Sequence, residues 1–117
     1  MGSAALFHLA RRGVKAIGVE QFEPGHDRGS SHGESRAIRL SYFEHPSYVP
    51  LLKSAFENWH ELERLTGETV LTATGIIEAG KLGSRLVAGS LEACHVHGLE
   101  HEVLTPAEVR RRFPATQ

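Results

Sequence analysis

Apolar residues recur at helical spacing in three stretches of the chain, and this pattern predicts a helix over each of them. The stretches are residues 3–12, 47–66 and 82–97, where apolar side chains lie three or four positions apart on one helix face. The apolar face of the second stretch is predicted to pack into a core and consists of Tyr48, Leu52, Ala55, Trp59 and Leu62. Three glycines are expected to end these helices, namely Gly13, Gly67 and Gly98.

A fourth, short helix is predicted over residues 106–112 from its capping residues. Thr105 is a typical N-cap, Pro106 suits the first helical position, and Glu108 completes a capping box. The three arginines at positions 110–112 are expected to form a solvated face of this helix rather than a phosphate site.

The segments between the helices contain short apolar runs that favour extended structure. Residues 14–20 are predicted to form a buried strand. Residues 69–80 are predicted to form two short strands, or one strand that kinks at Gly75. Residues 100–104 are another candidate strand, whereas residues 36–42 are compatible with either a strand or a helix.

Composition and charge are those of a soluble globular protein with one ordinary domain. The chain has 117 residues, of which 40% are hydrophobic and 23% are charged, and its formal net charge is -1. This balance gives no indication of a nucleic-acid partner. No apolar run reaches the ~18 residues of a membrane span and no signal peptide is recognisable, so a cytoplasmic or organelle-matrix location is expected.

The cysteine and histidine residues give no indication of a metal centre. The single cysteine, Cys94, cannot form an internal disulfide and is predicted to be a buried thiol. His95, His97 and His101 lie close together in the sequence, but no cysteine or acidic residue completes a zinc motif such as HExxH. We therefore expect no bound metal.

The first twenty residues look like half of a dinucleotide-binding fingerprint. A helix that begins near Gly2 is followed by the apolar run of residues 14–20, which ends in the acid Glu20. In a dinucleotide fold the last loop glycine lets the helix pack closely on the sheet, and an acid about 20 residues later binds the ribose hydroxyls. A carboxylate suits the unphosphorylated ribose of NAD or FAD, but the same spacing also fits any helix–strand pair.

The loop that follows combines small residues with hydrogen-bond donors. The small residues would let the backbone approach a ligand and are Gly29, Ser30, Ser31 and Gly33. Donors and positive charge come from His32, Arg36, Arg39 and Tyr42. The two arginines are three positions apart and would share one side only on a helical turn. A ligand-binding loop and a solvent-exposed basic loop both fit this composition.

The segment EQFEPGHDRGSSHGESRAIRLSY, residues 20–42, resembles the monomeric sarcosine oxidase family of flavoproteins. That family includes N-methyltryptophan oxidase and pipecolate oxidase. The order of features is also similar: the acid, a loop with proline, SHGxSRxIR, a tyrosine, a helix with tryptophan, and TG before a strand. The resemblance extends from Met1 to about Phe113.

The resemblance implies an α/β fold, in the form of a partial Rossmann-like FAD-binding domain that lacks its first strand and most of its glycine loop. Residues 1–45 would form the dinucleotide-binding part with the flavin loop, and residues 46–117 would contain the start of a substrate domain. Family members are several times longer, so the chain is expected to be an amino-terminal fragment or a truncated gene model, inactive by itself. Met1 would then be an internal methionine of the glycine loop.

The activity that the resemblance implies is that of an FAD-dependent amine oxidase, monomeric at full length. The enzyme would oxidise the C–N bond of a small secondary amino acid with molecular oxygen and give an imine and hydrogen peroxide. The substrate would be similar to sarcosine, another N-methyl amino acid or pipecolate. The alternatives are a non-catalytic nucleotide-binding αβ domain and a fragment of an NAD-dependent dehydrogenase.

The resemblance also assigns roles to residues of the first forty-two. Glu20 would bind the adenosine ribose, with Gly2 as the last glycine of the loop. The residues expected at the flavin end of FAD are Ser30, Ser31, His32, Ser35 and Arg36, the last beside the isoalloxazine ring. Arg39 would pair with the substrate carboxylate, and Tyr42 would line the pocket. Ser31 replaces a histidine of bacterial sarcosine oxidases and Glu34 an aspartate, which indicates a different substrate.

Overall fold

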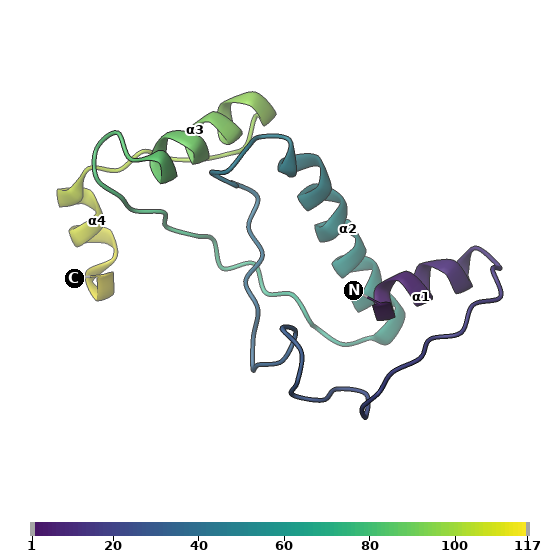
Figure 1. Cartoon of the computed structure of the whole chain (residues 1–117). Coiled ribbons are helices and arrows are strands. Elements are labelled where there is room, and N and C mark those ends of the chain that lie inside the picture. Colours follow the sequence, from purple (N-terminus) through teal and green to yellow (C-terminus); the bar gives the residue numbers. More distant parts are fainter. Residues whose placement is uncertain (1, 117) are drawn as a thin grey trace. The chain divides into compact units, whose positions relative to one another are not determined.

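The computed structural model describes residues 2–116, and its regular elements are helices joined by turns and extended segments (Figure 1). The helices are α1 Gly2–Arg11, α2 Tyr48–Thr66, α3 Arg85–His97 and α4 Pro106–Arg112, followed by the short 3-10 helix η1 Pro114–Thr116. The chain divides into two compact units, one that ends at Ala37 and one that begins at Ile38. Met1, expected to belong to a glycine loop, lies outside the described residues.

In the first unit, a turn at Gly13 brings the extended segment after α1 back against the helix. Gly13 has a φ of 74°, the left-handed conformation that ends a helix, and its N–H donates to the carbonyl of Ala10 at 2.9 Å. The following segment then lies against the helix, since a Cβ on Gly18 would be 2.7 Å from Cδ2 of Leu6. The segment thus comes close to the Leu6 side chain at Gly18, whereas the glycine expected to allow close packing was Gly2.

The predicted strands are the part of the α/β expectation that the structure does not reproduce. Residues 14–20 run without regular secondary structure, and the side chains of Ile17 and Val19 are 92% and 94% exposed. Residues 69–80 and 100–104 also lack strand structure. A strand exists only by hydrogen bonding to a neighbouring strand. Nothing within residues 2–116 pairs with these segments, so the sheet of a Rossmann-like domain is absent from the described part of the chain.

In the second unit, α2 confirms the helix predicted for this region, and it starts without a side-chain cap. The hydroxyl of Ser47 lies 2.9 Å from Nδ1 of His45 and does not cap the helix. At the other end Gly67 has a φ of 74°, and its N–H donates to the carbonyl of Glu63 at 2.8 Å. The glycine therefore ends the helix as predicted, because its left-handed conformation redirects the chain.

The core of the second unit is small. Its buried apolar residues are Val49 in the first turn of α2 and Ala93 and Cys94 in α3. The buried position predicted for Cys94 is confirmed. The apolar face predicted for α2 is only partly correct, because Tyr48 and Trp59 are 47% and 41% exposed.

The helices α3 and α4 end where the sequence predicted, and α4 also begins there. α3 begins three residues later than predicted because Gly83, with a φ of 74°, forms a turn that a helix cannot include. It ends at Gly98, whose φ is 59°. α4 has the predicted bounds, and its capping box is present: the Glu108 N–H donates to Oγ1 of Thr105, and the Thr105 N–H donates to the Glu108 carboxylate at 2.7 Å.

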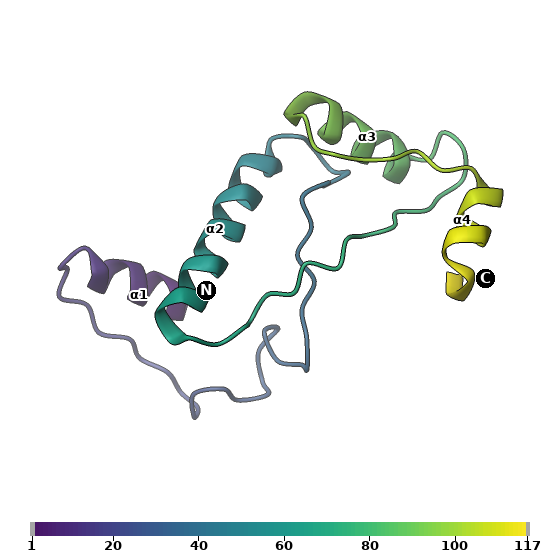
Figure 2. The same ribbon diagram turned by 180° about the vertical axis from the view of Figure 1, so that it is seen from behind.

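Gly89 marks the closest approach of α3 to the segment that precedes α2. A Cβ at this position would collide with the backbone of Phe43, at both its carbonyl group and its Cα. Figure 1 and Figure 2 show this segment beside α3 from two sides. The helix therefore meets the segment backbone to backbone, and only glycine leaves room for that contact.

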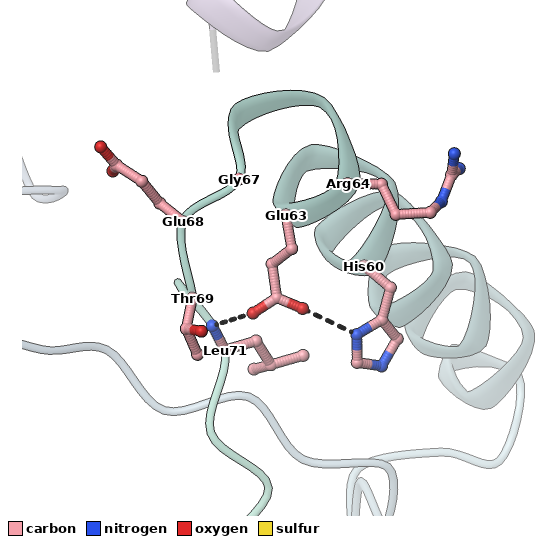
Figure 3. Close-up of a pocket in the computed structure, with 7 residues that line it drawn as sticks. All are labelled: His60, Glu63, Arg64, Gly67, Glu68, Thr69 and Leu71. Carbon is pink, nitrogen blue, oxygen red and sulfur yellow. Dashed lines mark hydrogen bonds and ion pairs between the residues drawn. The ribbon is translucent and has the colours of Figure 1, made fainter.

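Glu63, near the end of α2, holds the chain that leaves the helix (Figure 3). Its Oε1 accepts the N–H of Leu71 at 2.9 Å and of Val70 at 3.0 Å, and its Oε2 lies 3.0 Å from Nδ1 of His60. The carboxylate thus satisfies two backbone donors that a β-sheet would otherwise satisfy. These contacts, that of the Leu71 N–H foremost, hold the pKa of Glu63 below its ordinary value of 4.5.

Replacing Gly89 by alanine should destabilise the second unit. In an uncrowded helix the change to alanine would stabilise the fold by about 1 kcal/mol. At Gly89 the added methyl group meets the Phe43 backbone, which must move, so we expect a net loss of stability. Urea unfolding followed by circular dichroism measures this loss, and Ala88→Gly, an exposed position of α3, gives the cost of helix propensity alone. A more stable Gly89→Ala variant would contradict the close contact.

Acid should release residues 70 and 71 from Glu63. Because the folded-state pKa of Glu63 is lowered, its contribution to stability is present above the unfolded pKa of about 4.5 and is lost as the pH falls through the folded value. Amide exchange at Val70 and Leu71, corrected for intrinsic rates, should therefore accelerate as the pH falls below about 4.5. Glu63→Gln should abolish this pH dependence, whereas Glu57→Gln, at an exposed position of α2, should leave it intact.

Candidate functional site

Glu20 lies at the end of the extended segment of residues 14–20 with its carboxylate exposed. Its Oε1 accepts the backbone N–H of Gln21 at 2.8 Å and of Phe22 at 3.1 Å. These two donors, Phe22 first, hold the pKa of Glu20 below its ordinary value of 4.5, so the group is ionised at neutral pH. Its second oxygen, Oε2, has no hydrogen-bond partner within residues 2–116 and can accept hydroxyl groups of a ligand.

A small aromatic cluster orders the loop after Glu20. The rings of Phe22 and His26 meet edge to face at 5.1 Å, and the guanidinium of Arg28 lies 4.4 Å from the centre of the Phe22 ring. Nδ1 of His26 accepts the Arg28 N–H at 3.1 Å, and its Nε2 lies 3.6 Å from Oε1 of Glu20. The sequence analysis did not identify this cluster, which links the Glu20 carboxylate to the loop behind it.

Arg36 holds the loop of small residues together. Its two terminal nitrogens donate to the carbonyl of Ser35 at 2.7 Å and to the carbonyl of Ser30 at 3.1 Å. Gly33 has a φ of 133°, and a Cβ there would collide with the same guanidinium. The loop therefore wraps around Arg36, and a glycine at position 33 is favoured by the backbone conformation.

The other predicted loop residues lie on the outside of this turn. The N–H of His32 donates to the carbonyl of Gly29 at 3.1 Å, which closes the turn, and the side chains of Ser31 and His32 are exposed. The side chain of Glu34 is exposed as well. The structure thus gathers the predicted flavin-end residues 30–36 in one loop of the first unit.

Arg39 and Tyr42 form a second cluster, in the second unit. The guanidinium of Arg39 lies 4.5 Å from the centre of the Tyr42 ring, and the Tyr42 ring lies 5.5 Å from that of Tyr48. Nε of Arg39 is 3.6 Å from Oε1 of Glu78. The side chain of Arg39 is about one-third exposed and that of Glu78 is 14% exposed, so the pair is partly shielded from water.

Glu78 contacts the predicted site residue Arg39 and was not identified from the sequence. Its Oε2 accepts the hydroxyl of Ser41 at 3.2 Å, and its charge adds to the effect of burial in raising the pKa of the Cys94 thiol. The sequence signal that could have identified Glu78 is its position between two apolar neighbours, Ile77 and Ala79. In an apolar run an acid that becomes buried needs a partner, because an unpaired buried charge is costly.

The predicted site residues other than Gly2 lie in three groups: Glu20 with the aromatic cluster and residues 30–36 in their loop, both in the first unit, and Arg39 with Tyr42 in the second. Gly2 is the exposed first residue of α1, and a Cβ there would meet nothing within 4 Å. Arg36 belongs to the first unit and Arg39 to the second. The two arginines would share one side only on a helical turn, and residues 36–39 form no helix.

A shallow pocket lies at the end of α2 (Figure 3), and none of the predicted site residues lines it. It is lined by His60, Glu63, Arg64, Gly67, Glu68, Thr69 and Leu71. Among the described residues no group of three histidine, cysteine or acidic side chains is arranged to hold a metal ion. No helix of the described part is long and apolar enough to cross a membrane.

Comparison with known proteins connects the whole chain to one family. The family model described as "FAD dependent oxidoreductase" matches residues 1–117. The monomeric sarcosine oxidase of Streptomyces avermitilis is 52% identical over 114 residues, which are 97% of this chain and 30% of that protein. The monomeric sarcosine oxidase of a Bacillus species is 41% identical over 118 residues, covering 100% of this chain and 30% of that protein.

A more distant relative carries a different substrate in its name. The N-methyl-L-tryptophan oxidase of Yersinia pestis is 32% identical over 114 residues, 97% of this chain and 31% of that protein. The chain therefore spans about 30% of the length of the curated relatives it matches. These matches confirm the resemblance inferred from residues 20–42.

Proposed function

We propose, from the fact that the chain belongs to the family of FAD-dependent oxidoreductases, that it forms part of an oxidase acting on small secondary amino acids. The observation that carries this proposal is the 52% identity to a monomeric sarcosine oxidase, which extends over 97% of the chain. The substrate class would be an N-methyl or cyclic secondary amino acid such as sarcosine or pipecolate. The match to an FAD family favours FAD over the NAD of a dehydrogenase, and the complete enzyme would act as a monomer.

Features of the first unit support a role in binding FAD. Glu20 ends the segment that packs against α1 at Gly18, and its Oε2 is available for two ribose hydroxyls. The exposed residues Ser31 and His32 could lie against the flavin end of the molecule. When bound, FAD would accept a hydride equivalent from the substrate C–N bond, and molecular oxygen would take up these electrons and yield hydrogen peroxide.

Arg36 would shape the flavin end of the site and supply positive charge there. Its two terminal nitrogens already donate to the carbonyls of Ser30 and Ser35. The loop and the guanidinium would therefore be held in position before the cofactor binds. A fixed cation of this kind stabilises negative charge that develops next to it, at no cost in reorganisation.

Arg39 would bind the substrate carboxylate, with Tyr42 as a wall of the pocket. A carboxylate that enters a mostly apolar pocket needs a cation to meet it, and arginine can do so with two parallel hydrogen bonds. Such a clamp would fix the C–N bond relative to the cofactor, and the imine product would then hydrolyse in water.

A hybrid enzyme tests the proposed function directly. Residues 1–117 would replace the matching segment of the Streptomyces avermitilis sarcosine oxidase, which is similar enough for the exchange. We expect the hybrid to retain FAD and to produce hydrogen peroxide with sarcosine, N-methyl-L-tryptophan or pipecolate. A hybrid that retains FAD but oxidises none of the three would overturn the proposed substrate class. The same assays on the 117-residue chain alone show what it does without the rest of the Streptomyces protein.

Glu20→Ala in the hybrid should weaken FAD retention. The change removes the acceptor of the ribose hydroxyls, and a hydrogen bond to a charged group is worth about a tenfold change in affinity or more. Fluorescence of FAD released during dialysis measures the loss, with Glu23→Ala as an exposed acid three residues away for control. Equal FAD retention in the parent and the Glu20→Ala hybrid would exclude the ribose role.

Arg39→Ala in the hybrid should raise KM for sarcosine by about tenfold or more, because a charge-assisted, two-pronged contact is lost. Arg39→Lys should also raise KM, since lysine lacks the planar fork. FAD content should stay unchanged in both variants, and steady-state kinetics with flavin absorbance measure the two quantities together. Loss of flavin with no change in KM would move the carboxylate contact away from Arg39.

A further inference from the structure

We propose that Glu78 is a positioning residue for Arg39, and this inference rests on the proposed contact between Arg39 and the substrate carboxylate. Oε1 of Glu78 lies 3.6 Å from Nε of Arg39, and the Glu78 side chain is only 14% exposed. The two residues are far apart in the sequence and belong to the same unit. Their contact fixes one side of the guanidinium.

Glu78 is itself held in place by the segment that carries Arg39. The Ser41 hydroxyl donates to Oε2 of Glu78 at 3.2 Å, while Oε1 faces Arg39. The side chains at positions 39 and 41 both reach the Glu78 carboxylate. One carboxylate therefore bridges two side chains of this segment, and both of its oxygens have defined partners.

Tyr42 holds the guanidinium from a second direction. The N–H of Tyr42 donates to the carbonyl of Leu40 at 3.1 Å, a tight turn that brings position 42 out of strict alternation. This bend lets the ring of Tyr42 lie 4.5 Å from the guanidinium of Arg39. The ring of Tyr48 in turn packs against Tyr42 at 5.5 Å. The face of the guanidinium and its Nε side are thus both occupied.

What remains open on Arg39 is its terminal edge. Nε is buried and makes no hydrogen bond to any described residue, yet about one-third of the Arg39 side chain stays exposed. Neither terminal nitrogen donates to a described side chain or carbonyl. The two terminal nitrogens form the parallel fork that matches a carboxylate. Glu78 therefore aims Arg39 while leaving that fork for the substrate.

If Glu78 acted through its charge alone, its removal would have the opposite effect on substrate binding. A carboxylate beside Arg39 would repel the substrate carboxylate, and its removal would then tighten substrate binding. The positioning role predicts weaker binding on removal, because an unrestrained arginine must be ordered by the substrate itself. The sign of the change in KM therefore separates the two explanations.

The experiment uses the hybrid enzyme with Glu78→Ala, Glu78→Gln and Glu92→Ala. Glu78→Ala should raise KM for sarcosine and the inhibition constant of acetate by about tenfold, with kcat and FAD content little changed. Glu78→Gln keeps a carbonyl oxygen for Arg39, while its amide can donate to the Ser41 hydroxyl, and it should recover most of the affinity. Glu92→Ala, an exposed acid on α3, should behave like the parent. Acetate is included because it carries the carboxylate without the amine.

The possible results distinguish this inference from the proposed function. A parent hybrid that holds FAD but does not oxidise secondary amino acids contradicts the function. If the parent is active, then an unchanged or lowered KM in Glu78→Ala, or equal losses in Glu78→Ala and Glu78→Gln, overturns the positioning role.

A second measurement on the 117-residue chain does not depend on catalysis. In the parent chain the Nε proton of Arg39 should exchange slowly with water in nitrogen-detected NMR, because Nε is buried. Glu78→Ala should accelerate this exchange by about tenfold or more, and Glu78→Gln should do so less. Equal exchange rates in the parent and in Glu78→Ala would show that Glu78 does not hold Arg39.

Discussion

The extended segments of this chain depend on one constraint: their backbone donors and acceptors need partners that only another segment or a side chain can supply. The interior of a helix closes its own hydrogen bonds, and four α-helices form within the described residues. The segments around residues 14–20 and 69–80 have no β-ladder in that same part of the chain. Their conformation is set instead by a few side chains that bind the backbone.

Charged side chains take over that task at three places. Glu63 accepts two backbone N–H groups of the chain that leaves α2, and Glu20 accepts two from the residues that follow it. Arg36 donates to the carbonyls of Ser30 and Ser35. In each case a single charged group satisfies two backbone groups, which makes the local geometry sensitive to the loss of one side chain.

The accuracy of the sequence analysis followed the range of the interactions involved. The capping box of Thr105 and Glu108 and the stop at Gly98 are local, and the corresponding helix ends are correct. Strands need distant partners, so the pattern at residues 14–20 could not predict their exposure. Arg36 was predicted only as a donor, and its contacts with the loop carbonyls depend on the folded loop. Glu78 is likewise recognisable only once the chain brings it beside Arg39. Local sequence signals thus predicted where helices begin and end, whereas burial and side-chain partners depend on contacts between distant residues.

The arrangement at Arg39 shows how a partly shielded cation can persist without losing its donors. A bidentate pair with a glutamate would balance the charge but would also occupy the fork that a ligand needs. At 3.6 Å, the contact between Nε of Arg39 and Glu78 is too long for a good hydrogen bond, while the Coulomb attraction at that distance is still large. The Tyr42 ring adds favourable contact with the guanidinium face and takes up no N–H group. The positive charge is therefore offset by neighbours that leave its terminal hydrogen-bonding edge unused, which is what a preformed carboxylate site requires.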